Sequence, residues 1–426
     1  MNNTVCMNSI SVKDKSWPRM IALVDMNAFF ASIEQLDRPQ WQNKPVCVTN
    51  GRTGTCIITA SYEARARGIK TGMRLREARG LVPDLIQAPS RPYRYAQVSS
   101  SIMSALESIT PEVEIFSVDE AFLDLTGCQS LYDCSVEEIG RRIKACVFEV
   151  SGLLCSAGIS GDKTTAKWAA KKQKPDGLTI VHPYKARETL SGVLVTDLCG
   201  VGSGIGRYLA QYGVHRCGDM QKVPISVLGK RFGNLGKRIW LMAQGMDPEP
   251  LHKEVGVPQS IGHGKVIPPD TRDKTILRTY LLHMCEKVAA RLRRYDFDAQ
   301  LFSIGVNTPR GWVSKKLKTT TPTSDGDLIM ALADFFLNVY WDEGERSHGV
   351  HQVHVGALDP RPRHGQGELF SEEDVKKEKL LATIDQVNHR YGEFALCKAP
   401  LLNRSEMPNV ISPAWRPVGP RNTLES

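Results

Sequence analysis

The spacing of apolar residues predicts that the chain opens with a strand that delivers an acid to a helix. Residues Ile21 to Val24 are continuously apolar, and the run stops at Asp25. Apolar residues then recur at helical spacing at Phe29, Ile33 and Leu36. A carboxylate at the end of a buried strand is a candidate functional group, because acids are seldom left in apolar surroundings.

The pattern that follows predicts a strand-helix-strand-strand-helix-strand order. It comprises a helix from Tyr93 to Ile109, a hairpin over VEIFSVDEAFLDLT, a helix from Val136 to Val150 and a strand at LLCSAGIS. This order suggests a ferredoxin-like sheet with helices on one face. The architecture hosts unrelated functions and does not decide between them.

Two further modules are predicted downstream. The segment from about Pro183 to His252 has few strand signals and reads as a small helical domain. A second strand-helix-strand-strand-helix-strand series runs from Ser260 to Leu358. The remainder, from Asp359, is rich in proline, arginine and charged residues, so we expect it to lie outside the packed cores.

Composition narrows the class of protein. A chain of 426 residues should hold more than one domain, and 41% hydrophobic with 24% charged residues is typical of soluble globular proteins. Eleven cysteines without a CxxC pair argue against a zinc ribbon or a disulfide framework. The first twenty residues lack the apolar core of a signal peptide, and no stretch is long enough to cross a membrane. We therefore expect a cytoplasmic protein.

Charge and glycine placement favour a nucleic-acid partner. The formal net charge is +9, and lysine and arginine outnumber acids from Lys253 to Lys318. Gly200 and Gly202 in CGVGSGIGRYLAQYG would let a turn between two helices bring backbone N–H groups to a DNA phosphate. The alternatives are a solvated charged face and a plain glycine-rich turn.

Asp119 and Glu120 interrupt the apolar alternation of the predicted hairpin. If that hairpin neighbours the first strand, three carboxylates converge with Asp25 at one edge of the sheet. Carboxylate oxygens suit Mg²⁺, and two such ions can activate an attacking hydroxyl and stabilise a leaving pyrophosphate. The alternative is that Asp25 caps a helix and Asp119 starts a turn.

Tyr62, Arg65 and Lys163 favour the catalytic interpretation of these acids. They supply a phenol and two cations on other segments, a set that suits a triphosphate.

Several segments in order resemble the motifs of Y-family translesion DNA polymerases of the DinB/UmuC type. DMNAFFASIE resembles the first carboxylate motif, SYEARARGIKTGM the fingers motif and SVDEAFLDLT the second carboxylate motif. SAGISGDKTTAKWAAKKQKPDG and CGVGSGIGRYLAQYGV resemble the later palm motif and the thumb hairpin. The resemblance covers roughly Ile21 to Val214 and continues more weakly to about Leu358.

The resemblance implies an α+β multidomain enzyme that synthesises DNA past damaged template bases. Its parts would be a ferredoxin-like palm (21–37 and 90–182), fingers (38–89), a helix-hairpin-helix thumb (183–252) and a βαββαβ little finger (260–358). Residues 1–20 would be a polar extension, 253–259 a linker and 359–426 a tail. The partners would be primer-template DNA and a deoxynucleoside triphosphate, and the need for accessory subunits is left open.

The resemblance also implies the residues of the site. Two magnesium ions would be held by Asp25, Asp119, Glu120 and the carbonyl of Met26. The incoming nucleotide would contact Phe29, Phe30, Tyr62, Arg65 and Lys163. Among these, Phe30 would be the steric gate below the sugar. DNA would contact Gly200, Gly202, Lys315, Lys316 and Lys318.

Three short stretches depart from the family pattern or extend it. Asn27 stands where an acid is common, which fits the UmuC-like branch and leaves the metal set intact. Ser160-Gly161-Asp162 stands where many members have an asparagine before the lysine. QGELF resembles a peptide that binds a sliding clamp, with Gln366, Leu369 and Phe370 as its contacts.

Two other functions compete with this interpretation. A non-catalytic DNA-binding protein would keep the hairpin and the basic domain, but the intact Asp25, Asp119, Glu120 and Lys163 speak against it. A different palm-type enzyme, such as a nucleotide cyclase, would share the carboxylates but has no use for the helical hairpin or the basic domain.

Overall fold

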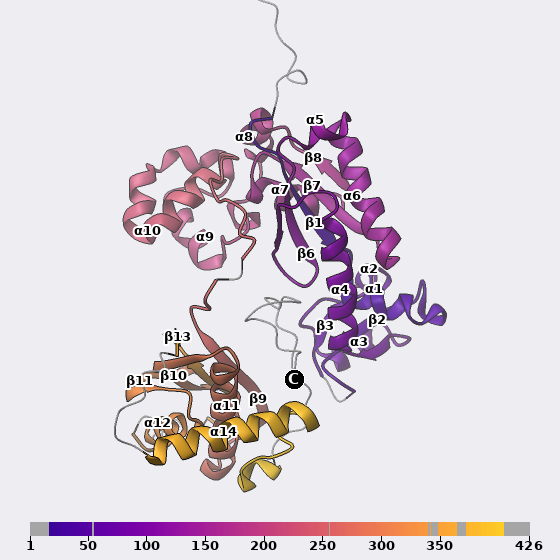
Figure 1. Ribbon diagram of the computed structural model, residues 1–426. Helices are drawn as coiled ribbons and strands as arrows, with labels where there is room; N and C mark the ends of the chain where they lie inside the picture. The colour runs from indigo at the N-terminus through magenta and orange to yellow at the C-terminus, as the bar shows by residue number, and fades with distance from the viewer. Residues whose placement is uncertain are drawn as a thin grey trace, which may run out of the picture. The chain divides into compact units, whose positions relative to one another are not determined.

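The computed structural model describes residues 17–52, 55–254, 256–339, 341, 348–363 and 372–403. Two compact units divide the described chain, one up to Glu254 and the other from residue 256 (Figure 1). Each unit is built around its own sheet and core.

The largest sheet of the first unit has five strands in the order β5-β6-β1-β7-β8. The strands are β1 (Ile21–Met26), β5 (Val113–Ile115), β6 (Glu120–Asp124), β7 (Cys155–Ser160) and β8 (Leu178–Ile180). The helices around it are α4 (Pro92–Leu106), α5 (Cys128–Tyr132), α6 (Val136–Ser151) and α7 (Lys163–Lys172). The first four strands in sequence, with α4 and α6 between them, give the ferredoxin-like arrangement that the sequence predicts.

Both faces of this sheet are covered, whereas the sequence predicts helices on one face. Ala22 and Val24 of β1 belong to the core that α4 and α6 close. Ile21 and Leu23 point the other way and pack against Ala166 of α7. Because β1 is apolar at every position from Ile21 to Val24, it can be buried on both faces.

A smaller sheet in the first unit has the strand order β3-β2-β4. Its elements are β2 (Val46–Thr49), β3 (Ile57–Ala60), β4 (Ile86–Pro89), α2 (Tyr62–Ala66) and α3 (Leu75–Leu81). Helix α1 (Phe29–Leu36) connects β1 to this subdomain. The hydroxyl of Ser61 accepts from the N–H of Ala64 and so fixes the start of α2.

The rest of the first unit is helical, as predicted. It comprises α8 (Ala186–Leu190), α9 (Ser203–Ala210), α10 (Ile225–Met242) and the 3₁₀ helices η4 (Val195–Asp197) and η5 (Cys217–Lys222). Gly233 has φ 62° inside α10 and divides that helix in two. Leu198, Val201, Leu209 and Ile239 are among the residues of its own small core.

The second unit repeats the βαββαβ element order with a different strand order, β11-β10-β12-β9. Its elements are β9 (Ile261–Thr271), α11 (Lys274–Arg294), β10 (Phe297–Thr308), β11 (Gly311–Thr323), α12 (Gly326–Val339) and β12 (Val350–Ala357). The short β13 (Arg361–Pro362) pairs with β10. The second strand-helix-strand-strand-helix-strand series is therefore present.

The chain after Asp359 does not lie wholly outside the core, which corrects the expectation from composition. It forms α14 (Glu372–Tyr391) and η6 (Ala399–Asn403), and Leu401 is fully buried in the core of the second unit. Asp385 of α14 forms an ion pair with Arg293 of α11. An ion pair such as Arg293–Asp385 gives no periodic signal, so the sequence does not predict that packing. Among the described helices, none is both long and apolar enough for a bilayer crossing.

Candidate active site

Pairing of β1 with β6 brings the predicted acids together. Asp25 and Glu120 are direct partners in this antiparallel pair, and the N–H of Met26 donates to the carbonyl of Asp119 over 2.9 Å. Directly opposed residues have Cα atoms about 4.5–5.5 Å apart, so their side chains can interact. The three acids thus share one end of the main sheet.

Two lysines neutralise part of this negative charge. Lys174 forms an ion pair with Asp25, and Lys167 of α7 forms one with Glu120. The hydroxyl of Ser117 donates to Asp119 over 2.7 Å. In this arrangement no three His, Cys, Asp or Glu side chains of the described ranges are already disposed around a metal position.

Burial is the largest influence on the pKa values of the three acids. Burial, followed by the hydrogen bond with Glu120, raises the pKa of Asp25 to about 7. Burial also raises the pKa of Asp119, with a further contribution from the charge of Glu120. Burial alone would raise the pKa of Glu120, but the hydrogen bond with Asp25 and the ammonium of Lys167 lower it on balance.

These acids are therefore a donor set that suits a divalent cation. Their carboxylates lie together at the ends of β1 and β6, where the ammonium groups of Lys174 and Lys167 balance charge that a cation could balance instead.

Asn27 takes no part in this group of acids. Its side-chain oxygen accepts from the hydroxyl of Ser156 over 2.9 Å, and its N–H donates to the carbonyl of Leu154. Position 27 therefore ties the end of β1 to β7 and leaves the three acids as they are.

Tyr62 and Arg65 both belong to α2. Tyr62 interacts electrostatically with Asp25. The Arg65 guanidinium is 5.1 Å from the centre of the Tyr62 ring, and its Nε donates to the carbonyl of Ala60 over 2.8 Å. Burial raises the pKa of Tyr62, and the charge of Asp25 contributes to the shift. The phenol of Tyr62 is thus close enough to Asp25 to interact with its charge, and Arg65 contacts the Tyr62 ring.

Phe29 and Phe30 differ in their surroundings. Phe29 is 2% exposed and belongs to the core of the main sheet. Phe30 is half-buried, and its ring stacks on that of Tyr95 at 4.5 Å between centroids. Of the two, Phe30 is therefore the residue that is partly exposed.

Lys163, which the resemblance implies as a triphosphate ligand, forms its ion pair with Glu114 and not with the three acids. Lys163 begins α7, and its ammonium donates to Glu114 over 2.6 Å and to the carbonyl of Pro250 over 3.3 Å. Asp162, just before it, caps α7 by accepting from the N–H of Thr165. Lys163 is thus part of a buried ion pair with Glu114 that holds the segment after α10 on the sheet.

Lys174 lies with the acids and was missed in the sequence. Helix α7 follows β7 and runs back along it, so its beginning lies near Ile21 and its end near Asp25. The 10 residues of α7 correspond to about 15 Å at a helical rise, and Lys174 follows shortly after the end of the helix. The direction of α7 along β7, a feature of the structure, is what brings Lys174 to Asp25.

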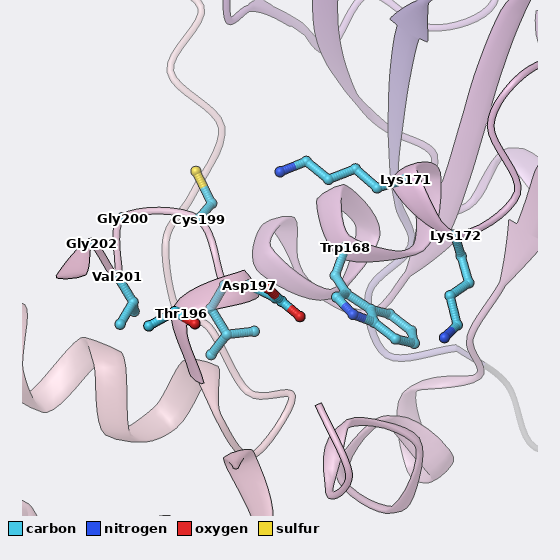
Figure 2. A pocket seen from close by; sticks show the side chains of 10 residues that line it. Trp168, Lys171, Lys172, Thr196, Asp197, Cys199, Gly200, Val201 and Gly202 are labelled. Atoms are coloured by element: carbon cyan, nitrogen blue, oxygen red, sulfur yellow. The ribbon is translucent and has the colours of Figure 1, made fainter. Parts of the chain in front are cut away.

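The predicted phosphate-binding turn lines a groove of about 760 Å³ between α7 and the helical subdomain (Figure 2). Lys171, Lys172 and Trp168 line it from α7, and residues 196–202 line it from the opposite side. Gly200 has φ +87°, and no atom lies within 4 Å of the position that a Cβ would take at Gly200 or Gly202. The backbone of this turn is therefore open to a ligand.

Three predicted lysines lie on β11, which is an edge strand of the second unit. Lys316 pairs with Ser303, and Lys318 pairs with Leu301. Val313 and Leu317 of the same strand pack on the core, and both lysines occupy the alternate positions. Lys315 shares the core-facing alternation of Val313 and Leu317. Lys316 and Lys318 thus belong to the helix-free face of the sheet, and Lys315 to the opposite face. The predicted clamp residues Gln366, Leu369 and Phe370 lie outside the described residues.

Comparison with known proteins decides the family. The chain matches the impB/mucB/samB family over residues 24–171 and that family's C-terminal domain over residues 258–369. The thumb domain of DNA polymerase-iota matches residues 196–247. The chain is 33% identical to DNA polymerase IV of Pelotomaculum thermopropionicum, across 89% of this chain and 94% of that protein. It belongs to the Y family of DNA polymerases, DinB type.

Further comparisons agree with this assignment. DNA polymerase IV of Moorella thermoacetica is 34% identical over 385 residues, 89% of this chain and 95% of that one. A solved Y-family DNA polymerase chimera has a TM-score of 0.69 and 26% identity, and the match covers 81% of this chain and all of that one. As a Y-family polymerase, the protein is a DNA-directed DNA polymerase of translesion synthesis with palm, fingers, thumb and little-finger parts.

Proposed function

We propose that this polymerase transfers a nucleotidyl group from a deoxynucleoside triphosphate to a primer 3′-hydroxyl at the sheet edge of Asp25, Asp119 and Glu120. The observation that carries the proposal is the direct pairing of Asp25 with Glu120 on neighbouring strands. Burial, followed by the hydrogen bond with Glu120, raises the pKa of Asp25 to about 7. Paired, partly buried carboxylates on two neighbouring strands are suited to cations rather than to structural hydrogen bonds.

Asp25, Asp119 and Glu120, with the carbonyl of Met26, would hold two divalent ions, and Mg²⁺ is the ion that their oxygen ligands favour. Bound there, the ions would make the primer hydroxyl a better nucleophile and stabilise the leaving pyrophosphate. Lys167 would remain with Glu120 and keep that carboxylate oriented, because the pair joins α7 to β6.

Lys174, Tyr62 and Arg65 would bind the triphosphate. Lys174 forms an ion pair with Asp25, and the charge of Asp25 contributes to the raised pKa of Tyr62. A phosphate oxygen that took the place of Asp25 on the Lys174 ammonium would leave Asp25 available to a cation. In this proposal Lys174 takes the role that the resemblance implies for Lys163, because the ammonium of Lys163 donates to Glu114.

Phe30 would lie below the sugar of the incoming nucleotide. Its partly exposed ring leaves room for a deoxyribose and would collide with a ribose 2′-hydroxyl. Phe29 is packed in the core, so it would act only as a support for α1.

DNA would run along the thumb groove and the little-finger sheet. Backbone N–H groups at Gly200 and Gly202 would bind phosphates, with Lys171 and Lys172 across the groove (Figure 2). Lys316 and Lys318 would contact further phosphates from the second unit. These contacts are independent of base sequence, as expected of an enzyme that copies any template.

QGELF would tether the enzyme to a sliding clamp. Leu369 and Phe370 would enter an apolar pocket of the clamp, and Gln366 would make polar contacts at its rim. Tethering raises the local concentration of the enzyme at the primer without changing the catalytic site.

Primer extension tests the proposed function. The protein should extend a labelled primer with Mg²⁺ and all four deoxynucleotides, on undamaged templates and on templates with a single damaged base. A non-catalytic DNA-binding protein would lower the electrophoretic mobility of the primer-template without extending the primer. A cyclase would consume a nucleoside triphosphate without a template. Either result would overturn the proposal.

A further inference from the structure

We infer that Glu34 is a positioning residue for sugar selection, and that it acts on Phe30 through Tyr95. The inference rests on the proposed role of Phe30 and adds to it the groups that fix the ring in place. Glu34 closes the stretch DMNAFFASIE, but the sequence does not indicate a role for it or for Tyr95.

Tyr95 contacts both residues from α4. Phe30 and Glu34 are four positions apart on α1 and therefore share one face of that helix. The Tyr95 ring stacks on Phe30 at 4.5 Å with an angle of 25° between the planes. Its hydroxyl donates to Glu34 over 2.7 Å. One tyrosine thus joins the proposed gate to an acid one helical turn away.

Glu34 is held from the other side by arginines. The Nε of Arg91 donates to the same oxygen of Glu34 over 2.8 Å, and Arg38 pairs with the other oxygen. Arg91 also pairs with Asp37 over 2.8 Å. Glu34 is 0% exposed, and a carboxylate is retained in such a position only when its charge is balanced.

Tyr95 is itself immobilised. It is 1% exposed, and burial together with the charge of Glu34 raises the pKa of its phenol far above neutrality. The hydroxyl therefore remains a donor to Glu34 at any pH at which the enzyme would work. A buried ring with a fixed hydroxyl has little freedom to turn or retreat.

A steric gate needs such a support. A ribonucleotide collides with the aromatic ring through its 2′-hydroxyl. The free energy by which this collision disfavours the ribonucleotide cannot exceed the free energy needed to move the ring aside. Tyr95 occupies the space behind Phe30, and Glu34 prevents Tyr95 from moving in turn. The selectivity of the gate would therefore depend on a residue that never touches the nucleotide.

The same helix also supports the acids. Ser99, one turn after Tyr95 on α4, donates to the carbonyl of Val118 over 2.6 Å. Val118 directly precedes Asp119. A shift of α4 would therefore affect catalysis in general, so the test has to separate sugar selection from the overall rate.

A double-mutant cycle makes this separation. The ratio of kcat/KM for a deoxynucleotide to kcat/KM for the matching ribonucleotide is measured for the parent, Tyr95→Phe, Tyr95→Leu and Glu34→Gln. The same three changes are made in a Phe30→Ala background. Contacting residues couple strongly enough that the ratio should fall about fivefold to tenfold in Tyr95→Leu and Glu34→Gln, with Tyr95→Phe lower than the parent. In the Phe30→Ala background the same changes should leave the ratio as it is.

Met103→Ala is the control for a loosened α4. Met103 is 3% exposed on α4 and about 12 Å further along the helix than Tyr95. It should lower the melting temperature and keep the parental ratio. Equal loss of selectivity in Met103→Ala, or a parental ratio in Glu34→Gln or Tyr95→Phe, would overturn the inference.

The reference variant separates this inference from the proposed function. If Phe30→Ala lowers the ratio while Glu34→Gln and Tyr95→Phe do not, the gate stands and the role of Glu34 fails. If Phe30→Ala itself keeps the parental ratio, the gate role of Phe30 fails and the inference falls with it.

Discussion

Lys174 forms an ion pair with Asp25 at the end of β1, although 149 positions separate the two residues in the chain. Helix α7 produces this contact, because it carries the chain from the far end of β7 back to the edge where the acids lie. Lys163, at the start of the same helix, pairs with Glu114 instead. The two lysines therefore have separate roles.

Replacing each lysine by methionine should distinguish these roles. Lys174→Met should lower kcat/KM for a deoxynucleotide by about 10- to 100-fold, the effect of losing one hydrogen bond to a charged group. Single-nucleotide incorporation by pre-formed enzyme–DNA complexes measures this change, and the affinity for DNA should be unaffected.

Lys163→Met should act on stability. It leaves Glu114 buried without its cation, which should lower the free energy of unfolding by about 3 kcal/mol. Denaturant unfolding measures this loss. The assignment is wrong if Lys163→Met weakens nucleotide use more than Lys174→Met does.

The sequence predicts which acids meet, but it does not predict which cation meets them. Asp25, Asp119 and Glu120 follow from strand pairing, since an apolar strand and an apolar hairpin are natural neighbours. The segment from Lys163 to Lys174 contains several lysines, and the sequence does not show which of them lies at the end of the helix that is close to the acids. Only the helix direction relative to β7 excludes Lys163 and selects Lys174.

Phe30→Ala should admit ribonucleotides more readily than the parent does. The ring is partly exposed and backed by Tyr95, so its removal opens the space where a 2′-hydroxyl would lie. The measurement is incorporation of matched ribo- and deoxynucleotides opposite one template base. A folded variant with parental selectivity would show that Phe30 is a packing residue only.

Two lysines of β11 should contribute to DNA affinity and their neighbour should not. Replacing Lys316 and Lys318 by alanine should reduce the slope of log K against log salt by about 2, because each lost phosphate contact reduces it by about one. Lys315→Ala is the matched control, since its side chain belongs to the opposite face of the sheet. Equal effects of all three lysines would contradict this division.

Leu369→Ala combined with Phe370→Ala should abolish stimulation by a sliding clamp. The two apolar anchors carry most of the binding energy expected of so short a peptide. Extension without the clamp should be unchanged, because the peptide is proposed to act only as a tether. Clamp stimulation equal to that of the parent would rule out the tether.

The fold follows from the sequence more closely in the strands than in the tail. Both βαββαβ series have clear apolar periodicity, so their element order is predictable. The strand order of the second sheet is not, because β12 lies between β10 and β9 through long-range pairing. Leu401 enters the second core from the apolar stretch 394–402, which is too short to give a periodic signal.

The contacts of Glu34 show the same limit within the site. A glutamate on a short helix is typical of an exposed surface, and nothing in the local sequence indicates burial. Its surroundings come from Arg91 and Tyr95, 57 and 61 positions away. Such a group becomes visible only when α1 and α4 are packed together.

The acids at the ends of β1 and β6 are proposed to serve chemistry and not DNA binding. Asp119→Ala separates the two roles, because Asp119 lies outside the paired residues of β1 and β6 and its side chain can be removed without changing the pairing of Asp25 with Glu120. The measurement is the rate of single-nucleotide addition by enzyme already saturated with primer-template DNA, with DNA affinity determined on the same preparation. We expect the rate to fall at least about 1,000-fold, as for the loss of a metal-ion site, with unchanged DNA affinity. A near-parental rate in Asp119→Ala would contradict the account.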